Sequence, residues 1–416
     1  FDYKEFLANK QVYYRSFVRE DEVVRLRGDK GNPVIAYALK IRGDLVKRFN
    51  RYLKSSQSAA VAATLILGYR SELSDEIVEA YSKTGTMHVL SVSGMHVGLV
   101  FIVLSFGLRA LDRKKWLRLF KTVLIITFVW AYALISGFSP SVCRAALMLS
   151  FYLIGKALDR SHNSYNLMAA SAFFLLLYNP HYLFDIGFQL SYLAIFGLLL
   201  FHRPIYNWFY IKNWLLDNDW NYSSVSVAAQ TTTVPLSIFY FHQFPVYFLI
   251  SNLFIVIPVT VVMYAGLLFV FIPQELVSTW LGALLTWMID FLNRGLYFIE
   301  ELPLASIDSL VLTDLECIIM YLAIFMAFYA FSSRQRGSFV AALICILVLT
   351  TTKAMSEIAK ARRHELIFHS LSRNTAISYI KGDSATVITD LDETDRVVSY
   401  SILPALIERG VKQRRF

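Results

Sequence analysis

Ten long apolar runs dominate this sequence from residue 88 onward, and they constrain the fold more than any other feature. The runs lie at 88–109, 121–137, 141–156, 166–178, 182–201, 226–241, 246–272, 278–298, 315–332 and 338–352. A helix needs about 20 residues to cross the hydrocarbon core of a bilayer. We therefore predict a mainly α fold, a polytopic α-helical membrane bundle of about nine or ten membrane elements with partial β segments at both ends.

The composition agrees with this prediction. Hydrophobic residues make up 56% of the chain and charged residues only 17%, whereas charged residues are about a quarter of a typical soluble domain. The three cysteines, Cys143, Cys317 and Cys345, lie far apart in apolar runs, which predicts packing roles and neither a disulfide framework nor a metal site. No cofactor is predicted.

The charges of the loops predict the orientation of the chain. The loop after the first run carries six basic residues against Asp112, namely Arg109, Arg113, Lys114, Lys115, Arg118 and Lys121. Loops rich in Lys and Arg stay in the cytoplasm. Alternation then places Lys156, Arg160, the 202–222 loop and residues 332–337 inside, and residues 1–33 and the turns near 138–140 and 179–181 outside. The net charge of +9 fits such loops, and it also fits attraction of lipid head groups or nucleic acid.

The polar segments divide the chain into four parts. Residues 1–33 alternate in polarity and predict the last strands of an external β domain; the chain starts with Phe1, which is typical of a fragment or a processed form. Residues 34–87 predict interfacial helices, one of them capped by Ser74 and ended by Gly85. The membrane-spanning region follows at 88–353. Residues 354–416 predict a short α/β tail of three strands, a turn at Gly382 and a helix near 399–410.

The helix at 34–54 is predicted to be amphipathic and basic, and such helices usually lie on a membrane surface. A solvated face of a soluble domain is the alternative. Its positive charges are candidates for electrostatic contact with DNA or lipid: Lys40, Arg42, Lys47, Arg48, Arg51 and Lys54.

Polar residues interrupt the first apolar run. On a helix that starts at residue 88, His88, Ser91 and His96 share one broad face, and Gly94 and Gly98 form an adjoining stripe suited to helix packing. His96 lies about two turns deeper than His88, which makes it the better candidate for lining a cavity. His88 fits an interfacial position equally well.

Three later segments also place polar groups at membrane depth. In 136–148, Ser141 opens a run and Arg144 follows, either snorkelling to the interface or carrying a fixed charge at the mouth of a pathway. In 184–201, Asp185 and Gln189 share a face, Ser191 points elsewhere, and Asp185 is a candidate ion-pair partner of Arg144.

In the segment 232–258, three prolines predict broken helices beside a cavity: Pro235, Pro245 and Pro258. Pro258 predicts a break in the run 246–272, or two short helices there. His242 lies at a turn of the same segment, and Asn252 lies inside the following run.

Together these polar groups predict a hydrophilic interior. Two other interpretations remain open. Ser93 and His96, three residues apart, resemble the nucleophile and base of an intramembrane serine protease. The prolines fit a secondary transporter of small polar solutes, although no internal repeat is visible.

Five ordered motifs carry a resemblance to a known family. "TGTMHVLSVSGMHVGLV" resembles the signature of the ComEC/Rec2 competence proteins. "LILGYRSELS", "SGFSPSVCRAALM", "FDIGFQLSYLAIFG" and "VPLSIFYFHQFPVYFLISNLFIVIP" resemble further motifs of that family, in the same order. The resemblance spans about residues 60–353.

The resemblance implies a channel in the bacterial inner membrane that moves single-stranded DNA into the cytoplasm during natural transformation. It implies single-stranded DNA, membrane lipids, an external DNA receptor and a cytoplasmic helicase or DNA-binding protein as partners. Its polar wall would then include Ser91, His96, Arg144, Asp185, Gln189, His242 and Asn252, acting by hydration and positioning and not as catalytic groups.

The family resemblance also bears on the two ends of the chain. Relatives carry an oligonucleotide-binding-fold domain before the channel, which residues 1–33 would end, and many carry a metallo-β-lactamase-like domain after it. The tail here has His364 and His369 but no HxHxDH metal motif, so a nuclease activity is not predicted and the chain is interpreted as a non-enzyme.

Overall fold

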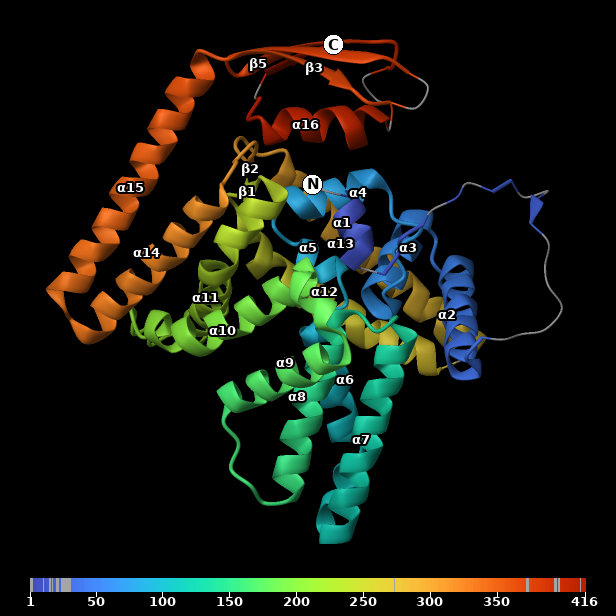
Figure 1. Ribbon diagram of the computed structural model, residues 1–416. Coiled ribbons are helices and arrows are strands. Elements are labelled where there is room, and N and C mark those ends of the chain that lie inside the picture. The colour runs from blue at the N-terminus through green and yellow to red at the C-terminus, as the bar shows by residue number, and fades with distance from the viewer. Residues whose placement is uncertain are drawn as a thin grey trace. The chain divides into compact units, whose positions relative to one another are not determined.

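A computed structural model describes residues 3–9, 11–14, 16, 18, 19, 22, 23, 31–272, 274–371, 374–392, 395, 397–411 and 413–416 (Figure 1). The chain divides into two compact units. The larger unit contains residues 2–229 and 245–305, and the smaller one contains residues 1, 230–244 and 306–416. Each unit is described separately below.

Helices account for the larger unit. In chain order they are α1 (Tyr3–Asn9), α2 (Pro33–Tyr52), α3 (Ser56–Leu67), α4 (Asp75–Lys83), α5 (Met87–Leu90), α6 (Gly94–Gly107), η2 (Arg109–Arg113), α7 (Lys115–Ile135), α8 (Pro140–Ala157), α9 (Ser164–Tyr178), η3 (Pro180–Phe184), α10 (Ile186–Tyr206), the first part of α11 (Trp214–Phe241), α12 (Phe248–Phe271) and α13 (Glu275–Glu300). The division between the units falls inside α11 and at the two-residue strands β1 (Phe244–Pro245) and β2 (Ser306–Ile307).

Helix α3 is the most deeply buried helix segment of the larger unit that the structure describes, and its predicted place at the membrane interface stays a prediction. Ten of its residues, Ser58 to Leu67, are buried, and α3 packs on α2, α12 and α13. Its alanine-rich sequence lets neighbouring backbones come close, since small residues permit tight helix crossings. A Cβ atom on Gly266 of α12 would lie 2.1 Å from Cδ1 of Ile66, so a larger residue there would force the Ile66 side chain to shift.

Polar side chains of α13 hold α3 and α4 in place. Ser58 donates to Asp290, and Tyr81 donates to Asn293. Lys83 of α4 forms ion pairs with Glu79 and Glu300 at 2.6 and 3.2 Å. Burial by itself would lower the pKa of Lys83, but the two carboxylates outweigh burial and raise this pKa. The polar groups of α13 therefore serve packing between helices.

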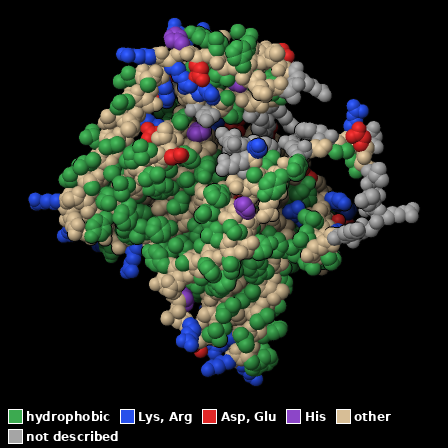
Figure 2. Space-filling model, in the orientation of Figure 1, with side chains coloured by type: hydrophobic (Ala, Val, Ile, Leu, Met, Phe, Trp, Pro, Cys, Tyr) green, Lys and Arg blue, Asp and Glu red, His purple; other side chains and the backbone are tan. Residues whose placement is uncertain are grey.

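A second group of packed helices consists of α6, α7 and α8. Their shared core contains Val97, Val100, Ile125, Val129, Val142 and Ala146. Helix α9 packs on α8, and α10 packs on both. Large apolar side chains also face outward along these helices, and Figure 2 shows many hydrophobic side chains on the surface. Such a surface suits contact with lipid.

Helices occur at all ten apolar runs in the part of the chain that the structure describes, which confirms the mainly α membrane-bundle prediction. Six of these helices are long and apolar enough to cross a membrane: α7, α10, α12, α13, α14 (Asp314–Ser333) and α15 (Arg336–Ala361). Shorter apolar helices are α3, α6 and α9. Ser74 caps the start of α4 as predicted, and Gly85, with φ of +75°, directly follows the C-cap residue Thr84.

The prediction of one helix from residue 88 is wrong. Helix α5 ends at Leu90, residues Ser91–Ser93 are extended or irregular, and α6 starts at Gly94. Ser93 competes for backbone hydrogen bonds and caps the new helix, as serine does at N-termini. His88, Ser91 and His96 therefore do not share a helical face.

The predicted proline breaks are wrong at two of three positions. Pro235 lies inside α11 and Pro258 inside α12, while Pro245 lies in strand β1. Proline removes one backbone hydrogen bond, and helices at membrane depth tolerate this where neighbouring helices pack around them. Pro258 is buried, which fits this explanation.

In the smaller unit, α14 and α15 form an antiparallel pair (Figure 1). Glu316 joins them: it accepts from the backbone N–H and the hydroxyl of Thr313 at 2.9 and 3.1 Å, and it lies 3.3 Å from Nζ of Lys353. Thr313 and Glu316 thus form a capping box at the start of α14. Lys353 also donates to the carbonyl of Val311.

Replacing Glu316 by alanine should lower the free energy of unfolding by about 2 kcal/mol, because a cap and the partner of Lys353 are lost together. Unfolding of the purified protein in detergent, followed by circular dichroism, measures this change. Glu357→Ala is the matched control. That carboxylate pairs with Lys360 but is half exposed, so its loss should cost about 0.5 kcal/mol or less. Equal effects of the two substitutions would contradict the capping role.

The tail contains the three predicted strands and one more. Strands β3 (His364–His369), β4 (Ala376–Lys381) and β5 (Ser384–Thr389) are antiparallel neighbours, with the predicted turn at Gly382. A π-helical turn, η4 (Val398–Ile402), and α16 (Leu403–Glu408) then lead to β6 (Gln413–Arg415), which pairs in parallel with β5. The likeness of this tail to a metallo-β-lactamase-like domain stays a prediction.

At the other end, helix α1 lies within the segment 1–33, which was predicted to contain strands. The described positions of this segment carry no strand, and its other positions, including 24–30, lie outside the described residues. The external β domain proposed for residues 1–33 stays a prediction.

Candidate functional site

The start of α6 fixes the histidine that the sequence singled out. The backbone N–H of Ser93 donates to Nδ1 of His96 at 3.1 Å, and the Ser93 hydroxyl lies 3.0 Å from the same nitrogen. Because Nδ1 accepts a backbone N–H, the proton of the neutral ring lies on Nε2. The His96 side chain is fully buried, and Nε2 has no hydrogen-bond partner among the described residues. His96 therefore presents a buried, unpaired N–H donor.

Arg144 of α8 lies buried near the same turn of α6. Its residue exposure is 5%, and its guanidinium carbon lies 5.4 Å from the centre of the Tyr192 ring on α10. Its Nε and Nη1 atoms have no hydrogen-bond partner within the described ranges. A buried charge without a full set of partners is costly. Arg144 therefore holds a fixed charge inside the bundle. Its side chain does not extend to the membrane surface.

Gly94 brings Arg144 and α6 together. A Cβ atom at Gly94 would lie 3.4 Å from Cβ of Ala145 and 3.7 Å from Nη2 of Arg144. This contact agrees with the packing role predicted for Gly94. At Gly98, in contrast, no described atom lies within 4 Å of such a Cβ, so the predicted packing contact does not occur there.

Two further buried hydroxyls were not singled out by the sequence. The Tyr132 hydroxyl on α7 and the Ser139 hydroxyl before α8 have no hydrogen-bond partner among the residues described. Tyr132 belongs to the core that α6, α7 and α8 share. A tyrosine in an apolar run is usually a packing or interfacial residue, so the helical periodicity could not identify Tyr132 as a site residue. The one available signal was that Tyr132 lies close in sequence to the turn at Gly137, which joins α7 to the helix that carries Arg144.

Other predicted wall residues serve local structure. Asp185 caps α10 by accepting from the N–H of Phe188 at 2.9 Å, and no ion pair with Arg144 occurs among the described residues. The proposed Asp185–Arg144 pair is therefore wrong, because an Asp before a helix satisfies the free N–H groups of its first turn. Gln189 donates to the carbonyl of Leu183 at 2.7 Å. Ser141 and Ser191 are half-buried in α8 and α10.

The remaining candidates are scattered. His88 is exposed on α5, and Ser91 is half-buried where that helix ends. Asn252 of α12 has a buried Oδ1 without a hydrogen-bond partner in the described part of the chain. His242 belongs to the smaller unit, where its carbonyl accepts from the N–H of Leu310 at 2.8 Å.

The basic residues of α2 have different surroundings. Arg48 donates to the carbonyls of Val270 and Ile272 and to the hydroxyl of Ser278, and it covers the Phe269 ring at 4.5 Å. It thus satisfies carbonyls at the end of α12, a packing role the sequence did not reveal. Arg51 lies 3.5 Å from Glu275. Arg42 is half-buried near Tyr69, whereas Lys40, Lys47 and Lys54 are exposed.

The Ser93–His96 pair and the histidines of the tail are the two places where the sequence raised the question of catalysis. The Ser93–His96 contact exists, but the other ring nitrogen lacks the orienting partner that a base of a catalytic triad has. In the tail, His364 lies 2.8 Å from the Tyr379 hydroxyl and His369 lies 2.8 Å from the Ser378 hydroxyl. Burial lowers the pKa of His369, and Arg409 lowers it further. The described residues contain no group of three His, Cys, Asp or Glu suited to a metal.

The unpaired groups of the larger unit are mainly hydrogen-bond donors. Nε2 of His96 and two guanidinium nitrogens of Arg144 carry N–H groups, and the hydroxyls of Tyr132 and Ser139 can also donate. The start of α6 adds the positive end of a helix dipole. Donors of this kind can bind the oxygen atoms of an anion, of which a phosphate is the common biological example.

Comparisons with known proteins agree with the motifs. The family model described as Competence protein matches residues 65–334. The chain is 28% identical to ComE operon protein 3 of Bacillus subtilis (strain 168) over 304 residues, 69% of this chain and 36% of that protein. It is 25% identical to Recombination protein 2 of Haemophilus influenzae over 175 residues, 41% of this chain and 22% of that protein.

An uncharacterized protein of Aquifex aeolicus (strain VF5) is 30% identical over 198 residues, 47% of this chain and 44% of that protein. The matches thus span less than half the length of each of these relatives. No solved structure matches the chain. The six membrane-capable helices together with the family match identify a membrane protein. Since the family model covers more than half of the sequence, the chain belongs to the Competence protein family, as its resemblance to ComEC/Rec2 proteins predicted.

Proposed function

We propose that this chain forms part of a bacterial inner-membrane channel through which single-stranded DNA enters the cytoplasm during natural transformation. The observation that carries the proposal is the buried set of unpaired donors around Arg144 and His96, within segments that match the family model. A DNA strand carries one phosphate per nucleotide, and a path through lipid must replace the water and counterions around each of them.

The donors suit transient contact with a moving polyanion. A guanidinium donates charge-assisted hydrogen bonds to phosphate oxygens, and Nε and Nη1 of Arg144 have no hydrogen-bond partner among the described residues. The Tyr192 ring under the guanidinium holds it in one orientation. No acid forms an ion pair with Arg144 among the described residues, so an arriving phosphate does not have to displace a bound carboxylate.

The proposal includes partners on both sides of the membrane. An external receptor would deliver the DNA, and a cytoplasmic helicase or single-strand-binding protein would take it up. The charge pattern of the loops supports this direction, because the basic loop 109–121 is predicted on the cytoplasmic side.

Uptake of labelled duplex DNA by competent cells tests the proposal. Cells that lack this chain should still bind the label at the surface, but nuclease-resistant label in the cytoplasm should fall to background. Re-expression of the chain should restore it as single strands. Normal entry of label into cells without the chain would refute a channel role, and loss of surface binding would indicate a receptor instead.

A further inference from the structure

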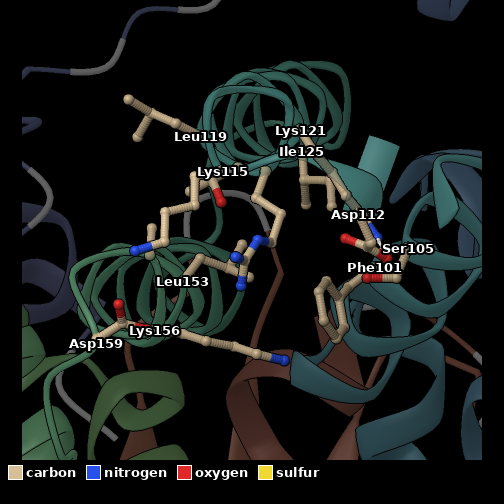
Figure 3. A pocket seen from close by; sticks show the side chains of 13 residues that line it. Phe101, Ser105, Asp112, Lys115, Leu119, Lys121, Ile125, Leu153, Lys156 and Asp159 are labelled. Carbon is tan, nitrogen blue, oxygen red and sulfur yellow. Dashed lines mark hydrogen bonds and ion pairs between the residues drawn. The ribbon is translucent and has the colours of Figure 1, made fainter. Parts of the chain in front are cut away.

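A basic pocket lies at the end of α6, α7 and α8 that is remote from Arg144. Twelve residues of α8 separate Arg144 from Lys156 in the pocket wall, which corresponds to about 18 Å along the helix. Its volume is about 150 Å³, and its wall includes Phe101, Asp112, Lys115, Arg118, Lys121 and Lys156. A single water needs roughly 10–15 Å³ by this measure, so a phosphate group fits. Figure 3 shows the Lys156 side chain extended across the pocket and the Phe101 ring at its side.

The charge of the pocket is positive. Lys121 pairs with Asp112 at 2.8 Å and its side chain is only 12% exposed, so this pair forms a fixed part of the wall. Lys115, Arg118 and Lys156 make no ion pair among the described residues. Asp159 also lines the pocket and offsets one of these charges. The pocket therefore favours a small anion over a neutral group.

The surface beside the pocket is apolar and indicates which anion. Leu119 lines the pocket and is 55% exposed, and its neighbours Trp116 and Phe120 are 66% and 54% exposed. They belong to α7, a helix able to cross the membrane. Trp side chains concentrate at the depth of lipid head groups. The acyl chains of a lipid would pack on these apolar side chains. A nucleic acid has no acyl chain to make this contact, so the surface favours a lipid.

The basic side chains gather at one tip of this part of the molecule. Figure 2 shows Lys and Arg side chains over the ends of α7 and α8, next to the hydrophobic surface. The positive-inside pattern predicts this tip at the cytoplasmic leaflet, and basic pockets between membrane helices on that side suit anionic head groups.

We propose that this pocket binds the phosphate of an anionic phospholipid, such as phosphatidylglycerol, from the cytoplasmic leaflet. The proposal does not depend on DNA transport, since it concerns a separate end of the helices and a ligand that belongs to the membrane.

Native mass spectrometry of the purified full chain tests this assignment, with phosphatidylglycerol or phosphatidylcholine added in detergent. The wild type should retain one phosphatidylglycerol in preference to phosphatidylcholine. Arg118→Gln with Lys156→Gln should weaken this binding roughly tenfold or more, because two charge-assisted hydrogen bonds are lost. Lys156→Gln alone, which removes one exposed charge, should give a smaller loss and guards against misfolding of the double variant.

Arg113→Gln with Lys114→Gln is the matched control, because it removes two positive charges close to α7 from residues that do not line the pocket. It should change phosphatidylglycerol binding less than about threefold, as expected of exposed charges. Equal loss in both double variants, equal retention of the two lipids, or displacement by inorganic phosphate at the lipid's own concentration would overturn the proposal. Loss of binding to a single-stranded oligonucleotide with unchanged lipid binding would also overturn it.

Discussion

Replacing Arg144 by methionine should slow DNA entry roughly 10- to 100-fold, while the protein remains as stable as the wild type or becomes more stable. The guanidinium is buried, and two of its nitrogens have no partner among the described residues. Removal of an incompletely paired buried charge relieves a desolvation penalty, so an apolar side chain that fills the space should leave the stability unchanged or raise it. The proposed phosphate contact, worth about 1.5–3 kcal/mol, is lost, which corresponds to roughly 10- to 100-fold slower entry.

Two measurements on the same variants separate function from folding. Nuclease-protected label per cell, divided by the amount of chain in the membrane, reports DNA entry. The unfolding midpoint in detergent reports stability. Arg144→Lys keeps the charge but loses the planar fork, so its uptake should lie between the wild type and the methionine variant.

Arg48→Met is the matched control for the Arg144 experiment. Arg48 donates to two carbonyls and a hydroxyl at the end of α12, so its loss should reduce stability and thereby the amount of chain. Normal uptake in the Arg144→Met variant at normal amounts would remove Arg144 from the DNA path. A drop in stability as large as that of Arg48→Met would assign Arg144 a packing role.

Replacing Gly68 by alanine should destabilise the larger unit by about 3 kcal/mol, the sum of two penalties. Gly68 ends α3 with φ of +70°, a left-handed conformation that disfavours any Cβ. The added Cβ would also lie 2.8 Å from the backbone oxygen of Ser136 and 3.2 Å from Cγ2 of Val92. A backbone atom cannot move away as a flexible side chain can, so the turn after α7 would have to shift.

Gly43→Ala gives the opposite sign and is the control. Gly43 lies inside α2, and nothing lies within 4 Å of its added Cβ. Alanine there should leave stability unchanged or raise it by up to about 1 kcal/mol, since glycine is a poor helix former. Thermal unfolding of both variants in the same detergent decides the matter, and similar midpoints for the two would contradict the proposed strain at Gly68.

The Gly68 experiment also touches the candidate site. Ser136 follows α7 directly and lies four residues after Tyr132 and three before Ser139, the two buried hydroxyls without partners. A shift of this turn would move both hydroxyls and the start of α8. We therefore expect the remaining folded Gly68→Ala protein to show reduced DNA entry as well.

The sequence by itself determined where the helices of the long apolar runs lie, apart from the break at 91–93, and to which family the chain belongs. Backbone N–H and C=O groups in lipid must pair within the segment, so an apolar run long enough to cross forms a helix whatever surrounds it. The cap at Ser74 and the three strands of the tail were also predictable, because they depend on neighbours a few residues away. The family was predictable because its motifs occur in this sequence in a fixed order.

The partners of the polar side chains depended on the tertiary structure. Asp185 and Arg144 looked complementary, yet Asp185 caps its own helix and Arg144 rests on Tyr192. Arg48 looked like a surface charge but closes the end of α12. A helical period of 3.6 residues states which side chains share a face of one helix. The period does not show which face of a second helix packs against that face. Helix crossing angles and close approaches decide this, and they are set by the packing of the whole unit.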